Sequence, residues 1–190
     1  MRTKLTRLPP MKDGELDEEQ EKIIAPFRSA NADFNVSRAF VRHPRALAAF
    51  RVWATYVMID KNDLPERERE IVAMRTAWRI RAPYVWSRHI SYGQKAGLTD
   101  AEMSALKRPI EDHDWSAADI ALIRTADTLV DHFFVPDDVW KELSAHFNER
   151  QCMDAIFCCG HFCLLGMFLN TADTPLDGDV PHDPDFDVVK

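Results

Sequence analysis

The chain has 190 residues, of which 46% are hydrophobic and 29% are charged, and its formal net charge is -7. This length and composition are typical of one globular domain that buries a hydrophobic core without help from metals or disulfide bonds. The negative charge argues against binding to nucleic acid or to anionic lipid, because both require a basic surface. An anionic small molecule is not excluded, since a few arginines can dominate one pocket.

The N-terminal residues and the cysteines bear on where the protein works. The first twenty residues contain no continuous apolar segment of the kind that a secretory signal requires. No stretch reaches the roughly 18 uncharged apolar residues of a membrane-spanning helix, and the most apolar run, from Ala155 to Leu169, is interrupted by two glycines and a histidine. All four cysteines lie between Cys152 and Cys163, which is not the spacing of a disulfide framework. We therefore expect a cytoplasmic protein with reduced thiols and no membrane segment.

Helical spacing of apolar residues recurs along the chain, whereas strict alternation of polar and apolar residues is rare. The sequence therefore predicts a single all-α domain over residues 17–173. An irregular arm over residues 1–16 precedes it. A tail over residues 174–190, rich in proline and aspartate, is expected to be irregular and solvated.

Prolines, glycines and capping residues place the ends of the predicted helices. A first helix is expected over residues 17–28, and His43-Pro44 opens a second one that ends at the polar stretch 61–63. Pro65 suits the first turn of the next helix, and Pro83 is expected to end it. A further helix is expected over residues 84–96, with Gly97 as its left-handed cap, and a short one begins at a capping box at 99–102. Another helix is expected from an N-cap at Ser116 to about residue 132, and the next begins at Pro136. The last helix is expected to begin after residues 148–150 and to end at about Asn170.

One histidine in the central stretch, residues 64–98, is a candidate for chemistry. His89 shares a helix face with Val85, Trp86 and Gly93. An imidazole in such surroundings can act as a general acid or base, because its ordinary pKa is close to neutrality. The alternative is a core histidine that is hydrogen-bonded to a backbone carbonyl.

The same stretch carries the pattern L-x(5)-E followed by A-x-Y-x-W-x(2)-H-x(7)-G-L, which resembles the carboxymuconolactone decarboxylase and alkylhydroperoxidase D-like family. A weaker resemblance includes the turns at 34–35 and 43–44 and the closing helix GHFCLLGMFLN, so most of the chain to about Asp177 is covered. The resemblance implies a single-domain, all-α helical bundle of the alkylhydroperoxidase D-like type that assembles into homo-oligomers, commonly trimers or hexamers. The matching residues are Leu64, Glu70, Ala82, Tyr84, Trp86, His89, Gly97 and Leu98.

The redox centre of the peroxidase-type members is missing. Those members carry C-x-x-C-x-x-x-H, with a glutamate twelve positions before the first cysteine. Counting back from His89 places Glu70 at the glutamate position, but Ala82 and Val85 at the two cysteine positions. A dithiol centre requires two sulfurs within bonding reach, so the thiol-peroxidase mechanism does not carry over.

The resemblance to the decarboxylase-like members implies that Glu70 and His89 act as a pair. It implies a lyase-like enzyme of aromatic compound catabolism that needs no cofactor and no metal. His89 would move a proton on a small organic acid or lactone during decarboxylation, isomerisation or hydrolysis, while Glu70 orients or polarises it. However, Glu70 lies roughly 20 Å and His89 roughly 9 Å along their helices from the break at Pro83. Their meeting therefore requires a steep helix crossing, a bridging water or a neighbouring subunit.

Several further residues are candidates for binding the substrate. Tyr84 and Trp86 could line an aromatic pocket, although packing between helices accounts for them equally well. Arg88, with Arg79 and Arg81 as the other choices, could stabilise a developing anion, and a solvated surface position is the alternative for each. A histidine in an apolar helix requires a partner or a pocket, so His161 could face the His89 site.

The final helix and the tail contain residues that could serve other functions. Cys158, Cys159, His161 and Cys163 point in different directions around one helix, so we expect no metal site and interpret the cysteines as small apolar residues. The aspartates of the tail lack the spacing of a calcium-binding loop. Phe, Met and Leu stripes on the helix are a candidate subunit interface. Two other functions remain open: an antioxidant protein that uses these cysteines, or a non-catalytic oligomer that binds a small molecule.

Overall fold

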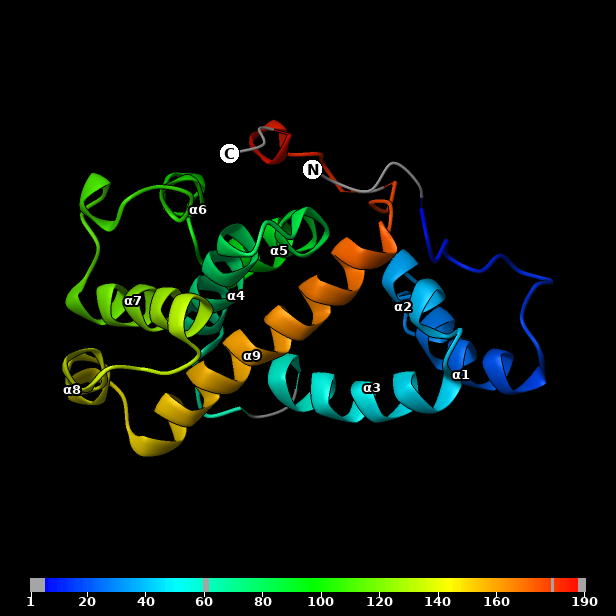
Figure 1. The fold of residues 1–190 in the computed structure, drawn as a ribbon, viewed down its shortest axis with the longest axis horizontal. Coiled ribbons are helices and arrows are strands. Elements are labelled where there is room, and N and C mark those ends of the chain that lie inside the picture. The colour runs from blue at the N-terminus through cyan, green and yellow to red at the C-terminus, as the bar shows by residue number, and fades with distance from the viewer. Residues whose placement is uncertain (1–5, 60–61, 179, 188–190) are drawn as a thin grey trace.

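The computed structural model describes residues 6–59, 62–178 and 180–187, and it consists of helices joined by short loops (Figure 1). No β-strand occurs within these residues, so the fold is all-helical, as predicted. The elements in chain order are α1 (Glu18–Ser29), α2 (Asn35–Phe40), α3 (Pro44–Met58), α4 (Glu66–Arg79), α5 (Pro83–Lys95), α6 (Asp100–Ala105), η1 (Ile110–Asp112), α7 (Ala117–His132), α8 (Asp137–His146), α9 (Glu149–Ala172) and η2 (Pro184–Phe186).

Helix α9 is the centre of the core. It packs against α3, α4, α5, α7 and α8, and it crosses the middle of the molecule in Figure 1. Cys152, Cys158, Cys159, Phe162 and Leu169 are all buried on it, so three of the cysteines are small apolar core residues, as predicted. Helix α4 packs on α9 and buries most of its own residues, including Glu70.

Among the described helices, α9 is long and apolar enough to cross a membrane. Half of its most apolar 18-residue segment is buried inside the protein. Core helices pass the same test of length and hydropathy as spanning helices. This property therefore does not by itself indicate a membrane segment.

Two of the predicted helix starts are confirmed by their hydrogen bonds. Thr99 Oγ1 accepts a bond from the Glu102 backbone N–H at 3.2 Å, and the Glu102 carboxylate accepts one in return from the Thr99 N–H at 2.7 Å. Ser116 Oγ accepts one from the Asp119 N–H at 3.1 Å. Each bond satisfies a backbone donor that the first turn of a helix leaves without a partner.

The expected role of Pro83 is wrong, because it begins α5 and does not end α4. Helix α4 ends at Arg79, and Arg81 follows in the left-handed region at φ 56°. The Ala82 N–H then donates to the Ala77 carbonyl at 2.8 Å, and the Arg81 N–H donates to the Trp78 carbonyl at 3.1 Å. These two bonds are those of a Schellman ending, and they leave Pro83 at the first position of α5, where its missing N–H costs little.

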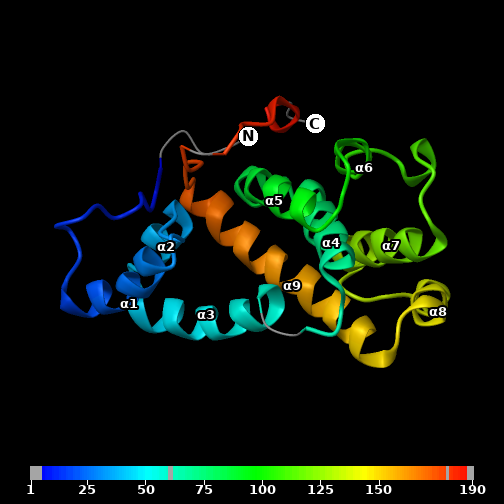
Figure 2. The same cartoon turned by 180° about the vertical axis from the view of Figure 1, so that it is seen from behind.

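The described part of the C-terminal tail is irregular apart from η2, but it is not the solvated segment that its composition predicts. Asp177 accepts hydrogen bonds from the Asn35 backbone N–H at 2.7 Å and from Arg88 Nη2 at 3.1 Å. Phe186 is buried against Trp78 and Trp86, with ring centroids 5.2 and 5.8 Å away. The tail therefore runs back over α5, as Figure 2 shows from behind.

Candidate functional site

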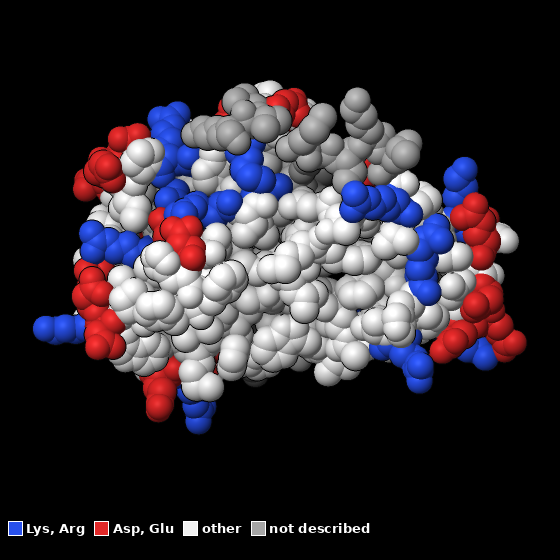
Figure 3. All heavy atoms as spheres, viewed as in Figure 1, with Lys and Arg blue, Asp and Glu red and all other residues white. Residues whose placement is uncertain are grey.

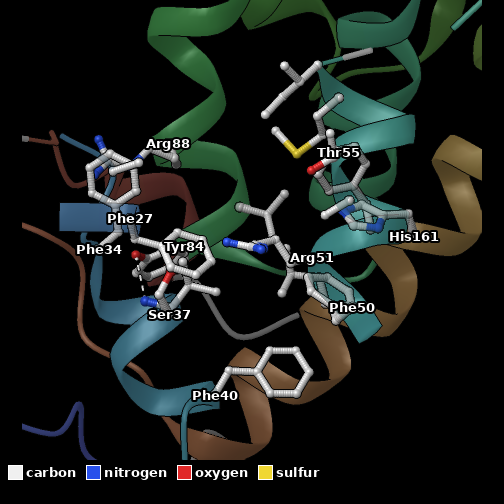
Figure 4. A pocket seen from close by; sticks show the side chains of 18 of the residues that line it. Phe27, Phe34, Ser37, Phe40, Phe50, Arg51, Thr55, Tyr84, Arg88 and His161 are labelled. Atoms are coloured by element: carbon white, nitrogen blue, oxygen red, sulfur yellow. Dashed lines mark hydrogen bonds between the residues drawn. The ribbon is translucent and has the colours of Figure 1, made fainter. Parts of the chain in front are cut away.

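A cavity of about 200 Å³ lies between helices α1–α3 on one side and helices α5 and α9 on the other (Figure 4). Its wall is mostly apolar, with Phe34, Phe40, Phe50, Tyr84 and Phe162 among the aromatic members. An apolar cavity of roughly 150 Å³ can hold benzene. This cavity therefore has room for one small ring with a few substituents.

Glu70 and His89 meet directly within one chain. His89 Nδ1 lies 2.7 Å from Glu70 Oε2, and both side chains are buried. They meet because α4 and α5 pack against each other, so the contact requires neither a bridging water nor a second subunit. An ionised carboxylate can only accept a hydrogen bond, which assigns the Nδ1 proton to the imidazole.

His89 lines the cavity, whereas Glu70 lies behind it and does not. The imidazole stands edge-on to the rings of Tyr92 and Phe162, with centroid distances of 5.4 and 4.7 Å. These contacts and the bond to Glu70 fix the ring orientation. Nε2 remains as the nitrogen that can exchange a proton with a molecule in the cavity.

Tyr84 and Arg88 line the same cavity and share a carboxylate from the tail. The Tyr84 hydroxyl donates to Asp177 Oδ2 and accepts from the Val36 backbone N–H at 3.1 Å. Burial, reinforced by Asp177, raises the pKa of Tyr84 well above its usual value, so the hydroxyl stays protonated. Arg88 lies over the Phe34 ring at 3.6 Å and pairs with Asp177 at 3.1 Å, so its charge is balanced.

The structure does not bring Trp86, Arg79 or Arg81 to the cavity. Trp86 is buried beside the rings of Trp78 and Phe186, which corresponds to the packing alternative. Arg79 pairs with two aspartates of α7. Arg81 lies over the rings of Trp78 and Phe186 at 4.5 and 4.8 Å. Of the three arginines considered from the sequence, only Arg88 faces the cavity.

His161 lies on the wall of the same cavity as His89. Its ring stacks on Phe50, with centroids 5.0 Å apart and planes 15° from parallel. Neither ring nitrogen has a hydrogen-bond partner in the part of the chain that the structure describes. Burial, and then the nearby His89, lower the pKa of His161 to about 4, so this ring is neutral near pH 7.

Arg51 is a cavity residue that sequence reasoning missed. It belongs to α3, and Figure 4 shows its guanidinium pointing toward the space between Tyr84 and His161. The side chain is exposed, and no described carboxylate lies within 4 Å of it. A single arginine on an amphipathic helix matches no motif, so no pattern in the sequence singles it out.

The family follows from the central part of the chain. Residues 44–127 match the model of the carboxymuconolactone decarboxylase family. This segment belongs to that family. It spans α3 to α6, η1 and most of α7, and so it contains both Glu70 and His89. No curated protein matches the chain in sequence.

Solved structures show the same fold at low sequence identity. The alkylhydroperoxidase AhpD core of a peroxidase-related protein from Ralstonia eutropha JMP134 has a TM-score of 0.78 at 17% identity, covering 93% of this chain and 95% of that one. A peroxidase-related protein from Silicibacter sp. TM1040 has a TM-score of 0.77 at 17% identity, covering 93% and 96%. A variant of the debrominase Bmp8 in complex with 2,3,4-tribromopyrrole has a TM-score of 0.75 at 13% identity, covering 93% and 94%. The carboxymuconolactone decarboxylase segment thus lies in a domain with the AhpD-like fold.

No cysteine is among the described residues that line the cavity. Val85, at one of the two positions where peroxidase-type members carry cysteine, lines the cavity with an apolar side chain. Burial raises the pKa of the Cys158 thiol. The hydrogen bond between Cys159 and Cys163 raises the pKa of Cys159, which burial raises further, and lowers the pKa of Cys163. No described group of three or more His, Cys, Asp or Glu side chains could hold a metal ion.

Proposed function

We propose that the protein is an enzyme in which His89 acts as a general acid and base, oriented by Glu70, on a small and mostly apolar organic acid or lactone. The observation that carries this proposal is the 2.7 Å contact between His89 Nδ1 and Glu70 Oε2 at the wall of the cavity. A positioned imidazole of this kind accelerates a proton transfer by roughly 10²–10⁴-fold.

Each residue of the site has a separate part in the proposed step. Glu70 accepts the hydrogen bond from Nδ1–H of His89, and it stabilises the positive charge that forms when Nε2 takes a proton from the substrate. The protonated ring can then return that proton to another atom of the same molecule. Tyr84, whose one O–H is donated to Asp177, and Arg88 form the polar part of the wall beside His89. Decarboxylation, isomerisation and hydrolysis each contain such a transfer, and the proposed step uses no cofactor.

The size and character of the cavity support a small ring as the substrate. About 200 Å³ of mostly apolar space favours a compact, unsaturated or aromatic body. The debrominase with a similar fold was solved in complex with 2,3,4-tribromopyrrole. One protein of this fold therefore accommodates a small ring. A lyase-like reaction in aromatic compound catabolism, in a reducing cytoplasm, is the setting that we propose.

The test follows proton transfer directly. The purified protein is incubated in D₂O with a panel of unsaturated lactones and ring acids, and NMR records both turnover and deuterium uptake. For a substrate found in this way, we expect His89→Gln to lower the rate by roughly a hundredfold or more, and Glu70→Gln to lower it by less. The matched control is His146→Gln, which changes an exposed histidine on α8. A His89→Gln variant with the wild-type rate would overturn the proposal.

One observation supports a second candidate, which is redox activity through the final helix. Cys163 is partly exposed, and a hydrogen bond from Cys159, four residues earlier on α9, lowers the pKa of its thiol. If a variant without cysteines loses an activity that His89→Gln retains, the antioxidant function replaces acid–base catalysis. If ring compounds bind but none is turned over, a ligand-binding protein is the better description.

A further inference from the structure

Arg51 brings a positive charge to the cavity that no neighbouring carboxylate balances. Its guanidinium points toward the cavity from α3 (Figure 4), and the guanidinium carbon lies 5.8 Å from the centre of the Phe27 ring. No aspartate or glutamate is among the described residues that line the cavity. Arg51 is therefore a charged group of the wall with no carboxylate among its fellow lining residues.

The other ionisable groups of the wall do not share this property. Arg88 is neutralised by Asp177 at 3.1 Å, and His89 is hydrogen-bonded to Glu70 at 2.7 Å. His161 is neutral near pH 7, because its pKa is lowered to about 4. An anion that approaches the cavity would thus meet Arg51 as the cation with no opposing charge on the described wall.

We propose that Arg51 binds the carboxylate of the substrate, and so restricts the cavity to small apolar acids that carry a negative group at one end. The inference rests on the proposed function and names the substrate class of the same site. A guanidinium binds a carboxylate through two parallel N–H donors. Because Arg51 is exposed, the carboxylate remains partly hydrated, which avoids the cost of burying a charge. The ring enters the apolar space, and proton transfer takes place at His89.

Binding of simple probes tests this assignment without knowledge of the substrate. Benzoate and cinnamate are titrated against the full-length protein by NMR or calorimetry, beside their neutral amides, benzamide and cinnamamide. We expect the acids to bind more tightly than the amides by roughly tenfold, which corresponds to about 1.4 kcal/mol. This preference should fall as salt is added, since the pair is exposed to solvent.

Substitutions of single arginines show which side chain causes the tighter binding of acids than of amides. Arg51→Gln should remove the preference for acids and leave the binding of amides unchanged, whereas Arg51→Lys should keep part of it. Arg45→Gln is the matched control, since it removes an exposed arginine of the same helix that does not line the cavity. The inference is wrong if the acids do not bind, if they bind no better than the amides, or if Arg51→Gln keeps the preference while Arg88→Gln loses it.

The same probes separate this inference from the proposed function. His89→Gln should abolish turnover but retain the preference for acids. If His89→Gln retains turnover while Arg51→Gln loses the preference, acid–base catalysis fails and the role of Arg51 stands. If His89→Gln abolishes turnover while Arg51→Gln binds acids as the wild type does, the catalytic proposal stands and the role of Arg51 fails.

Discussion

The two histidines of the cavity have opposite surroundings. His89 has a carboxylate partner for one ring nitrogen, with Nδ1 2.7 Å from Glu70 Oε2. His161 is buried against Phe50 with no partner for either ring nitrogen among the described residues, which favours the neutral ring. The two rings are therefore suited to different tasks, with His89 able to carry a proton and His161 forming part of the wall.

His161 should make the protein less stable in weak acid. Its pKa is lowered to about 4 from 6.5, so between these values the unfolded state binds more protons than the folded state. The free energy of unfolding therefore rises with pH across this range, and it falls as the pH is lowered from 6.5 toward 4. Each pKa unit corresponds to about 1.36 kcal/mol, so the full loss is about 3 kcal/mol. Urea unfolding at several pH values measures it.

His161→Phe provides the comparison, because a phenyl ring can keep the stacking on Phe50 but cannot be protonated. We expect this variant to lose most of the pH dependence between about pH 6.5 and pH 4 that the wild type shows. An unchanged slope in the variant would mean that groups other than His161 cause the acid sensitivity.

Residues of the cavity can be predicted from the sequence only where they belong to a recognisable local motif. Glu70 and His89 stand at fixed spacing in the family motif, and they meet as a pair. Arg51 matches no motif, and the carboxylate that neutralises Arg88 lies 89 residues further along the chain, in a tail expected to be solvated. Trp86 is part of the motif, but its ring faces Phe186 of that tail and not the cavity.

Some helix ends are determined by neighbouring residues and can be predicted, whereas others involve contacts with distant parts of the chain. The starts at Thr99 and Ser116 follow from side chains that cap the next turn, so a few residues decide them. The end of α4 depends on Arg81 adopting a left-handed conformation, which is uncommon outside glycine. The guanidinium of Arg81 lies over the rings of Trp78 and Phe186, and the contact with Phe186, far along the chain, cannot be predicted from the local sequence. Helix α2 is only six residues long, too short for a periodic signal.

The C-terminal tail should contribute to stability through Phe186. This ring is 6% exposed and packs on Trp78 and Trp86. Phe186→Ala should lower the free energy of unfolding by roughly 2 kcal/mol, somewhat less than for a central core ring because the tail can readjust. Chemical denaturation measures the change. Phe134→Ala is the control, since Phe134 is 59% exposed and its loss should cost less than about 0.5 kcal/mol. Equal, small effects would mean that the tail is not docked in solution.

The whole molecule presents an apolar face along α9. Figure 3 shows few charged side chains in the middle of the face that α9 crosses. Met153, Leu164 and Met167 are exposed on this helix at 46%, 52% and 61%. Together with Phe157 and Gly160 they follow spacings of alternately four and three residues, which place them on one side of a helix. A Cβ at Gly160 would meet nothing within 4 Å, so another helix could approach closely there.

We propose that copies of the chain meet along this stripe, as expected for a homo-oligomer. A stripe with coiled-coil spacing can pack against its own copy, and large exposed apolar patches mark association sites. Light scattering should give the wild type a mass of several 21.9 kDa chains. Leu164→Glu combined with Met167→Glu should give monomers, because burying two unpaired carboxylates opposes association. Ala145→Glu, on an exposed position of α8, should leave the mass unchanged. A monomeric wild type would contradict the proposal, and an unchanged mass in the double variant would locate the contact on another face.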